Sequence, residues 1–472
     1  MKWFLFVPEL YCFAGGMIFL FLSMAKQTNP RRDYFTALFL AIIGVAVCLA
    51  SIRQEGLLFF EAYRVDLFSQ VFKVLLSIGL FLIISICSNL NGVAKRYHAE
   101  FFLLLFLCTL AMMLLVSSVH ILSIYVALEL SSYSLYILVA LRRDDRMGLE
   151  AGLKYFLVGI FASAVMIFGV ALLYSTTKAT YVTEMIRVLP GLLDSPAVVI
   201  GLLLTLCGFF FKLAVFPFHF WAPDVYQGAA NQATAYIATA SKVAAVAILI
   251  RMVAVSGDGS IYLVHVLVTL AIVSMTVGNL AAIAQKDFKR LLAYSTVAHA
   301  GYVLIGILSM NAAGYMSAIF YVTALLIMKF TVFLVVVNVA DDGRNLAISH
   351  LAGLYRRSPL LALALMVSIF SLAGIPPTIG FTGKFLVFIA ALEKGYFTLV
   401  LIAMINVVIS LYYYLLILKA AYLLEPEEVQ PGIQLSTPIK MLTSALVVVM
   451  VVVGIYPHHL IELTKAAAQM LN

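Results

Sequence analysis

The segment FFFKLAVFPFHFWAPDVYQGAA, residues 209–230, places one lysine in an apolar run that also contains two prolines. A charge inside a bilayer is costly, so such a residue is rarely retained without a function. Pro217 removes a backbone donor and interrupts helical geometry. Inside a membrane, an interrupted helix is tolerated where protein or trapped water satisfies the freed carbonyls, which marks an ion path. The segment therefore predicts a broken transmembrane helix in which Lys212 is functional.

The composition of the whole chain indicates an all-α polytopic membrane protein. Of its 472 residues, 64% are hydrophobic and 11% are charged, whereas about a quarter of the residues in a soluble protein are charged. Apolar runs of roughly 20 residues divide the chain into about fourteen candidate transmembrane helices. They are expected near residues 3–24, 34–52, 68–90, 100–118, 120–141, 152–174, 197–220, 231–253, 261–284, 289–310, 313–340, 358–391, 396–423 and 437–456.

Charge and cysteine usage limit the classes of partner and cofactor. Lys and Arg are concentrated in the loops that follow odd-numbered helices, which predicts both termini on the outer side of the membrane. The formal net charge of +8 then reflects a cytoplasmic face that meets anionic lipid, and it does not indicate nucleic acid. The five cysteines lack C-x-x-C spacing, and the chain has neither a G-x-G-x-x-G nor a Walker A motif. We therefore expect no redox cofactor, nucleotide or metal in this chain.

Ionisable residues deep inside the predicted helices are the main functional candidates. They are Lys73, Lys212, Lys242, Lys329, Lys384 and a single acid, Glu129. Lysine can lose its proton when it is desolvated or approached by another cation, whereas arginine effectively cannot. The lysines are therefore predicted to be proton sites. The alternative for each is snorkelling or a static ion pair, and for Lys73, near Asp66 and Gln70 at the start of its helix, this alternative is preferred.

A histidine on the tenth predicted helix adds a candidate relay. Ser295, His299 and Tyr302 recur at i, i+4 and i+7, on one face of that helix. Imidazole changes its charge near neutral pH, so His299 is a candidate proton relay, and Lys329 on the next helix is a second one. The alternative is a histidine that only hydrogen-bonds in helix packing.

The twelfth predicted helix repeats the interruption of the seventh. LAVFP at residues 213–217 is echoed by LAGIP at residues 372–376, and each broken helix also carries a deep lysine, Lys212 or Lys384. Five helices separate the two, so they run in opposite directions, which is the pattern of an inverted-topology repeat. The division expected is three N-terminal helices in 1–99, a first five-helix repeat in 100–256, an inverted second repeat in 257–423 and a C-terminal helix in 424–472.

Several motifs together resemble the antiporter-like subunits of respiratory complex I, in particular the N type. They are VPELYCFAGG at 7–16, YVALELSSYSLYILVAL at 125–141, FFFKLAVFPFHFWAPDVYQGA at 209–229, ATASKVAAVA at 238–247, QKDFKRLLAYSTVAHAGYVL at 285–304, SLAGIPPTIGFTGKF at 371–385 and GIYPHHLIELTKAAA at 454–468. The resemblance spans essentially the whole chain. Single motifs are shared with multi-subunit sodium/proton antiporters and membrane-bound hydrogenases, and subunits of those assemblies are the alternatives.

The resemblance implies a subunit of a proton-translocating NADH:quinone oxidoreductase that performs no redox chemistry itself. Glu129 is implied to pair with Lys212, Lys242 to be the central proton carrier, and Lys384 to be the exit-side lysine. Lys329 departs from the N type, which usually has a neutral residue there. Flavin, iron–sulfur clusters and quinone are implied in partner subunits. The implied partners are other membrane subunits of the assembly, including further antiporter-like ones, and the lipid of the cell inner membrane.

Overall fold

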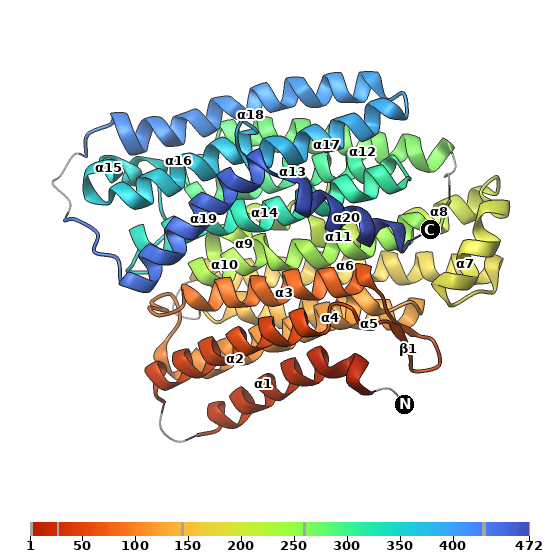
Figure 1. Cartoon of the computed structure of the whole chain (residues 1–472), viewed down its shortest axis with the longest axis horizontal. Helices are drawn as coiled ribbons and strands as arrows, with labels where there is room; N and C mark the ends of the chain where they lie inside the picture. Colours follow the sequence, from red (N-terminus) through yellow and green to blue (C-terminus); the bar gives the residue numbers. More distant parts are fainter. Residues whose placement is uncertain (1–2, 26–27, 143–145, 258–260, 427–430, 472) are drawn as a thin grey trace.

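The computed structural model describes residues 3–25, 28–142, 146–257, 261–426 and 431–471, which form one bundle of long helices (Figure 1). Within these ranges, 13 helices are long and apolar enough to cross a membrane. The predicted helix at residues 358–391 is not among them, because it is divided into two shorter helices. The predicted all-α polytopic membrane fold is confirmed.

The α-helices (α), 3-10 helices (η) and strands (β) follow one another along the chain. The first part contains η1 (Trp3–Phe6), α1 (Val7–Ser23), α2 (Pro30–Ala50), β1 (Gly56–Leu58), β2 (Tyr63–Val65), α3 (Leu67–Ser85), η2 (Lys95–Tyr97), α4 (His98–Ser117), α5 (Ile121–Ala140) and α6 (Arg146–Thr177). The middle part contains α7 (Val182–Val188), η3 (Leu189–Leu192), α8 (Pro196–Leu213), α9 (Trp221–Gly228), α10 (Asn231–Ala238), α11 (Ala240–Ala254), α12 (Ile261–Ile283), α13 (Phe288–Leu308) and α14 (Ala312–Val339). The last part contains η4 (Ile348–Leu351), α15 (Leu354–Arg357), α16 (Pro359–Ala373), α17 (Ile379–Glu393), α18 (Phe397–Leu423), α19 (Thr437–Ile455) and α20 (His458–Gln469).

Polar side chains set the starts of several helices, which is why the boundaries follow the sequence. The Asp66 carboxylate accepts the Ser69 N–H at 2.8 Å at the start of α3, and the Asp66 N–H donates to the Ser69 hydroxyl oxygen at 3.0 Å. At the start of α13, Asp287 accepts the Arg290 N–H at 2.9 Å. Such caps satisfy backbone donors that the first helical turn leaves without a partner.

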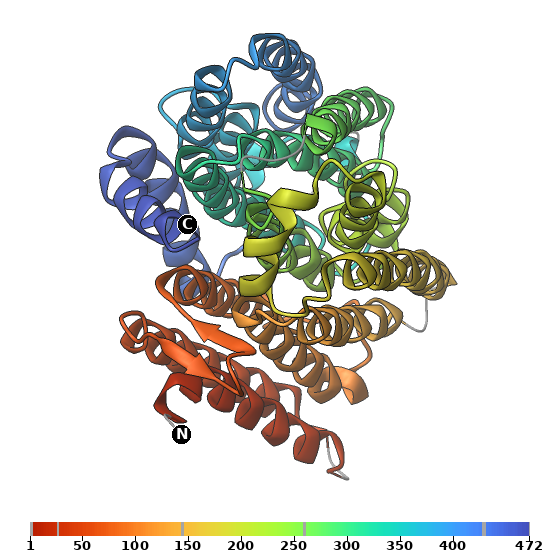
Figure 2. The same ribbon diagram turned by 90° about the vertical axis from the view of Figure 1, so that its right-hand side faces the viewer.

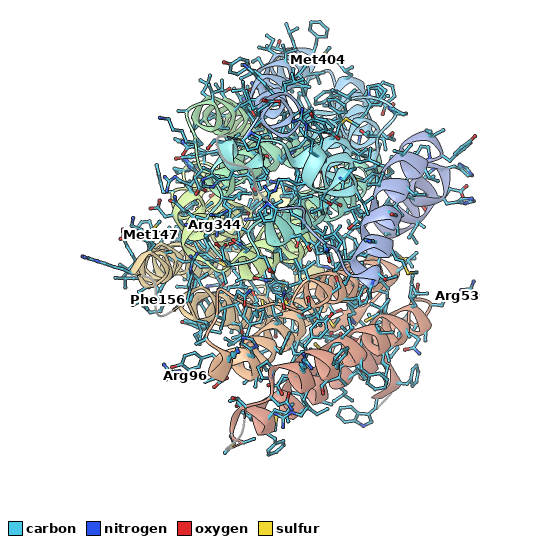
Figure 3. The ribbon with its side chains drawn as sticks, turned by 90° about the vertical axis from the view of Figure 1, so that its left-hand side faces the viewer. Arg53, Arg96, Met147, Phe156, Arg344 and Met404 are labelled. Carbon is cyan, nitrogen blue, oxygen red and sulfur yellow. The ribbon has the colours of Figure 1, made fainter. Side chains whose placement is uncertain are left out.

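The two ends of the bundle differ. Both chain ends, α7 and the β1–β2 hairpin lie at one end, which faces the viewer in Figure 2. Arg96 and Arg344 lie at the other end, seen in Figure 3. The hairpin and α7 were not predicted, since three-residue strands and a seven-residue helix are too short to leave a clear periodic pattern.

Glycines allow neighbouring helices to approach closely around the bundle core. A Cβ at Gly169 of α6 would lie 2.4 Å from the Thr205 backbone nitrogen of α8. A Cβ at Gly278 of α12 would lie 2.6 Å from the Ala298 nitrogen of α13. Small residues at such contacts let helix backbones pack directly in a membrane, where burial of apolar surface supplies little driving force.

The predicted broken helices are both present, as α8 with α9 and as α16 with α17. α8 begins beside α7 at one end of the bundle and α16 begins beside α15 at the other, so the two run in opposite directions (Figure 1). Each ends in a left-handed residue, Ala214 (φ 64) and Gly374 (φ 87). The next amide donates to the carbonyl five residues earlier, over 2.9 and 3.0 Å. The two interruptions therefore share the same helix-ending hydrogen-bond pattern.

The shared geometry defines the register between the two interruptions. It pairs Ala214 with Gly374, and therefore Lys212 with Leu372. The sequence match of LAVFP with LAGIP instead pairs Leu213 with Leu372, a register that differs by one residue. Residue identity and backbone conformation need not align in the same register. The division of the chain into two five-helix repeats stays a prediction.

Lys73 forms a static ion pair, one of the two environments favoured for it from the sequence, but its partner comes from another helix. Its ammonium forms an ion pair with Glu9 of α1 at 2.8 Å, and both side chains are 0% exposed. Tyr63 donates a 2.6 Å hydrogen bond to the same Glu9 oxygen. Glu129 is thus not the single buried acid. The sequence pattern missed the pair because Glu9 and Lys73 lie in different helices that only the tertiary fold brings together.

Arg251 is a buried basic residue that was not among the predicted candidates. It lies in α11, is 4% exposed, and donates to both carboxylate oxygens of Asp66 at 3.2 Å. The buried basic residues of the described chain are therefore not all lysines. Arg251 nevertheless belongs to the last turn of α11, where the end of the helix and a carboxylate both stabilise its charge.

Replacing Lys73 by Met is expected to destabilise the N-terminal helices. The variant leaves Glu9 charged and buried without its partner, and breaking a buried ion pair in this way costs about 3–5 kcal/mol. The measurement is the thermal unfolding midpoint of the purified complex. The double variant Lys73→Met with Glu9→Gln should recover more than half of the loss. An unchanged midpoint in Lys73→Met alone would show that Glu9 is already neutral.

Candidate functional site

Lys212 lies at the end of α8, buried against α5. Its ammonium donates to the hydroxyl oxygens of Ser131 at 2.8 Å and Ser132 at 3.1 Å. Glu129, also on α5, accepts a hydrogen bond from Ser163 of α6. The two charged groups do not form a direct ion pair in this structure. Lys212 is therefore held by neutral hydroxyls beside Glu129, and the implied pairing stays a prediction.

Lys242 contacts the broken helix directly. It lies in the first turn of α11, after Thr239, whose backbone (φ −119, ψ −88) separates α10 from α11. Its ammonium donates to the Lys212 carbonyl oxygen at 2.6 Å. It also lies 4.7 Å from the centroid of the Trp221 ring, a geometry that stabilises a cation. A change in backbone conformation at the α8–α9 break would therefore alter the environment of the Lys242 ammonium.

Lys384 has the corresponding contacts at the second break. Its ammonium, on α17, donates to the Leu372 and Ala373 carbonyl oxygens, both at 2.9 Å. Leu372 occupies the position that Lys212 occupies at the first break, so equivalent carbonyls bind Lys242 and Lys384. Carbonyls that end a helix lack intrahelical partners and carry the negative end of its dipole, which favours a cation. The duplicated feature is a helix end that binds a lysine from another segment.

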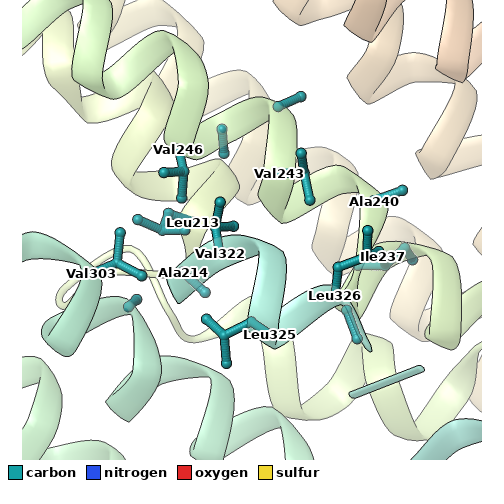
Figure 4. Packing of buried hydrophobic residues seen from close by; sticks show 14 of the residues in the cluster. Leu213, Ala214, Ile237, Ala240, Val243, Val246, Val303, Val322, Leu325 and Leu326 are labelled. Carbon is teal, nitrogen blue, oxygen red and sulfur yellow. The ribbon is translucent and has the colours of Figure 1, made fainter. Parts of the chain in front are cut away.

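A small cavity lies between Lys242 and Lys329. Its volume is about 20 Å³, and its polar lining also includes Thr239, Thr296 and His299. One water molecule needs about 10–15 Å³ and two to four polar partners, so this space can hold one. Its apolar walls, partly shown in Figure 4, include Leu213, Val246, Val303, Val322 and Leu325.

Lys329 of α14 faces this cavity rather than a solvated surface. Its ammonium donates to the Thr296 hydroxyl of α13 and, at 3.3 Å, to the Leu292 carbonyl oxygen. It forms no ion pair with a described carboxylate. Lys329 is thus a buried amine that lines the cavity together with Lys242 and His299.

His299 is part of a hydrogen-bonded chain that the sequence predicted only in part. Its Nδ1 lies 2.7 Å from the Tyr321 hydroxyl and its Nε2 lies 3.1 Å from the Tyr414 hydroxyl. Tyr414 also contacts the Ser295 hydroxyl at 2.7 Å. Tyr302 is not a member of this chain, and its ring instead lies 4.9 Å from the Lys384 ammonium.

A polar cluster ties the first break to the start of α13. Asp224 of α9 contacts Lys154 at 2.7 Å and Arg290 at 2.6 Å, and Arg290 also donates to Gln227. Burial opposes ionisation of Asp224, but the hydrogen bonds from Lys154 and Arg290 prevail and lower its pKa. The cluster joins α6 and α9, of the first predicted repeat, to α13 of the second.

The structure thus places the Lys242 ammonium against the Lys212 backbone carbonyl. Lys242, Lys329 and His299 line one cavity. Lys384 binds the helix end at the second break. Sequence reasoning missed the neutral groups that hold these side chains. They are Ser131, Ser132, Ser163, Trp221, Thr296, Tyr321 and Tyr414. No local pattern marks these groups, because Ser, Thr, Tyr and Trp are ordinary residues of membrane helices. No cluster suited to a metal ion occurs among the described residues.

Two oppositely directed broken helices with buried lysines at their ends define an antiporter-like membrane protein. Residues 118–410 match the family described as "NADH:quinone oxidoreductase/Mrp antiporter, TM". NADH-quinone oxidoreductase subunit N 2 of Syntrophobacter fumaroxidans is 65% identical over 471 residues, covering 100% of both chains. The chain belongs to this family and, within it, to the subunit N members of NADH-quinone oxidoreductase.

Solved structures agree with this result. A chain of respiratory complex I from Thermus thermophilus with bound aureothin has a TM-score of 0.83 and 32% identity, with 96% of this chain and 98% of that chain covered. A chain of the Mrp complex from Dietzia sp. has a TM-score of 0.88 but 22% identity, with 100% and 98% covered, and shows the fold alone. The N-type resemblance in the motifs is confirmed.

Proposed function

We propose that this proton-translocating, antiporter-like subunit moves protons through Lys212, Lys242 and Lys384, driven by quinone reduction in neighbouring subunits. The observation that carries this scheme is the 2.6 Å hydrogen bond from the Lys242 ammonium to the Lys212 carbonyl oxygen. It links the central lysine to the broken helix that carries the first one. A rearrangement at that helix end changes the environment of Lys242 directly.

Lys212 acts as the switch in this scheme. Near Glu129 its charge is stabilised, while Ser131 and Ser132 give it neutral partners that it can leave at lower cost than a carboxylate. Movement of its charge towards Lys242 brings two cations together in a low-dielectric interior. The repulsion drives the proton from Lys242, and the two lysines titrate as a coupled pair.

The route from Lys242 to the exit passes the cavity. Lys329 and His299 line it with Lys242, so one water molecule there can connect the three groups. His299 continues the route through Tyr321 and Tyr414. Lys384, held by the second break, is the exit-side group. His299 and Lys329 therefore act as relays between Lys242 and Lys384.

The assembly supplies what this chain lacks. Flavin, iron–sulfur clusters and quinone belong to partner subunits, so the energy arrives through coupling between subunits. The other partners are further antiporter-like membrane subunits and lipid. The chain ends share one end of the bundle (Figure 1). The smaller number of Lys and Arg in the loops predicted on that side supports an orientation with this end on the outer side of the cell inner membrane.

The carried ion is tested in sodium-free liposomes that contain the intact complex. We expect quinone reduction to move protons across the membrane, and a protonophore to abolish the pH gradient. A sodium ionophore should leave the gradient intact. A gradient that forms only with added sodium would instead support a sodium/proton antiporter, and purification without redox subunits would also contradict the proposal.

A further inference from the structure

The Lys242 ammonium contacts both halves of the first broken helix. From α8 it receives the Lys212 carbonyl oxygen at 2.6 Å, and from α9 the face of the Trp221 ring, whose centroid lies 4.7 Å away. The ionisable groups that face Lys242 are Lys212 of α8, Lys329 of α14 and His299 of α13, all of them basic. Lys242 forms no ion pair with a carboxylate in the described ranges. Its charge is therefore stabilised by a backbone carbonyl and an aromatic ring.

Three contacts fix the orientation of the Trp221 ring. Its Nε1–H donates to the Phe211 carbonyl oxygen of α8 at 3.1 Å. Its face stacks on Tyr155 of α6, with ring centroids 4.4 Å apart and an interplanar angle of 19°. Lys154, the residue before Tyr155, forms an ion pair at 2.7 Å with Asp224, one turn after Trp221 in α9. Because Trp221 is 1% exposed, its ring cannot turn away from Lys242 without breaking these contacts.

An aromatic ring stabilises a cation in a different way from a carboxylate. The electrons of the ring face attract an ammonium but not a neutral amine, and the attraction is stronger where water is excluded. The contact therefore favours the protonated form of Lys242. A carboxylate in the same low-dielectric interior would attract the ammonium much more strongly and would hinder release of the proton. The ring provides a weaker stabilisation that a small displacement can remove.

The second break has the same combination of partners. The Lys384 ammonium donates to two carbonyl oxygens at the end of α16, both at 2.9 Å, and lies 4.9 Å from the centroid of the buried Tyr302 ring. Lys212 and Lys329 instead donate to hydroxyl groups. Among the four described lysines of the proposed route, a ring thus accompanies those whose ammonium binds a helix end.

We infer that Trp221 is a positioning residue for proton translocation, whose ring face keeps Lys242 protonated while α8 and α9 hold their present arrangement. The inference rests on the proposed function, in which Lys242 is the central proton carrier. The ring and the Lys212 carbonyl belong to different halves of the broken helix, so a change in the angle between the halves separates one of them from the ammonium. The proton then passes to the groups that line the cavity with Lys242. Trp221 thereby couples proton release to movement of the broken helix.

The test replaces Trp221 by fluorinated tryptophans in the intact complex in liposomes. Fluorine withdraws electrons from the ring face and weakens its attraction for a cation, while the shape and the N–H of the ring are kept. The measurement is the number of protons moved per quinone reduced, as a function of pH. A less stabilised proton is lost at lower pH. The alkaline midpoint of this profile should therefore fall stepwise from tryptophan to monofluoro- and trifluorotryptophan, by about one pH unit in total.

The same fluorinated residues at Trp3, which is 54% exposed in η1, provide the matched control and should leave the midpoint unchanged. Trp221→Leu removes the ring and should also lower the midpoint. A lower midpoint in Trp221→Leu without any shift in the fluorinated series would show that the ring acts by packing, and would overturn the inference. In that case a loss of pumping in Lys242→Ala would still support the proposed function, whereas normal pumping in Lys242→Ala would contradict both.

Discussion

Replacing Lys212 by Met should lower the number of protons moved per quinone reduced by at least about tenfold, since a positioned proton-transfer group contributes about 10²–10⁴-fold. Methionine removes the charge but leaves the backbone carbonyl that binds Lys242. The variant therefore separates the charge of Lys212 from its backbone contact. Arginine should retain little activity, because its guanidinium stays charged and differs in shape.

The serine partners provide the graded control for Lys212. Ser131→Ala and Ser132→Ala each remove one hydroxyl from the Lys212 ammonium, and hydrogen bonds to charged groups contribute about 1.5–3 kcal/mol. Each variant should lower the proton ratio less than Lys212→Met does. An unchanged ratio in Lys212→Met, with the complex fully assembled, would contradict the role of Lys212 as a switch.

Replacing Lys242 by Ala is expected to abolish proton translocation in the assembled complex. The variant removes the group that contacts the first break and lines the cavity with Lys329 and His299. No other described lysine makes both contacts. The measurement is again protons per quinone reduced in liposomes, and the amount of assembled complex reports on folding.

The matched control for Lys242 is Lys440→Ala. Lys440 is an exposed lysine in the first turn of α19, away from the buried lysines, and its loss should leave the proton ratio unchanged. If Lys242→Ala pumps normally, the buried lysines are structural and the chain only anchors the assembly. A loss of pumping in both variants would point to a general effect of removing a positive charge.

The deep lysines show which parts of the site could be predicted from the sequence. Lys212, Lys242 and Lys384 were identified because a charge in a long apolar run has a high cost wherever the helix packs. Their partners could not be identified in this way. Lys73 pairs with Glu9, some sixty residues away in the chain, and Lys242 binds a backbone carbonyl, which every residue has.

The broken helices show the same division between what the sequence predicts and what only the tertiary structure decides. Proline restricts the backbone locally, so the two interruptions and their opposite directions could be predicted from residue types and helix count. The pairing of Lys212 with Leu372 depends on the left-handed residues Ala214 and Gly374, and alanine carries no local preference for that conformation.

By itself, the sequence determined the class of the protein, its membrane fold, its broken helices and the buried lysines, because hydropathy, proline and charge act locally and at a high cost in lipid. Tertiary structure alone decided which groups meet. It joins equivalent helix ends to Lys242 and Lys384, and encloses a cavity between Lys242 and Lys329. Such contacts depend on how distant helices pack, and many packings are compatible with the same apolar surface.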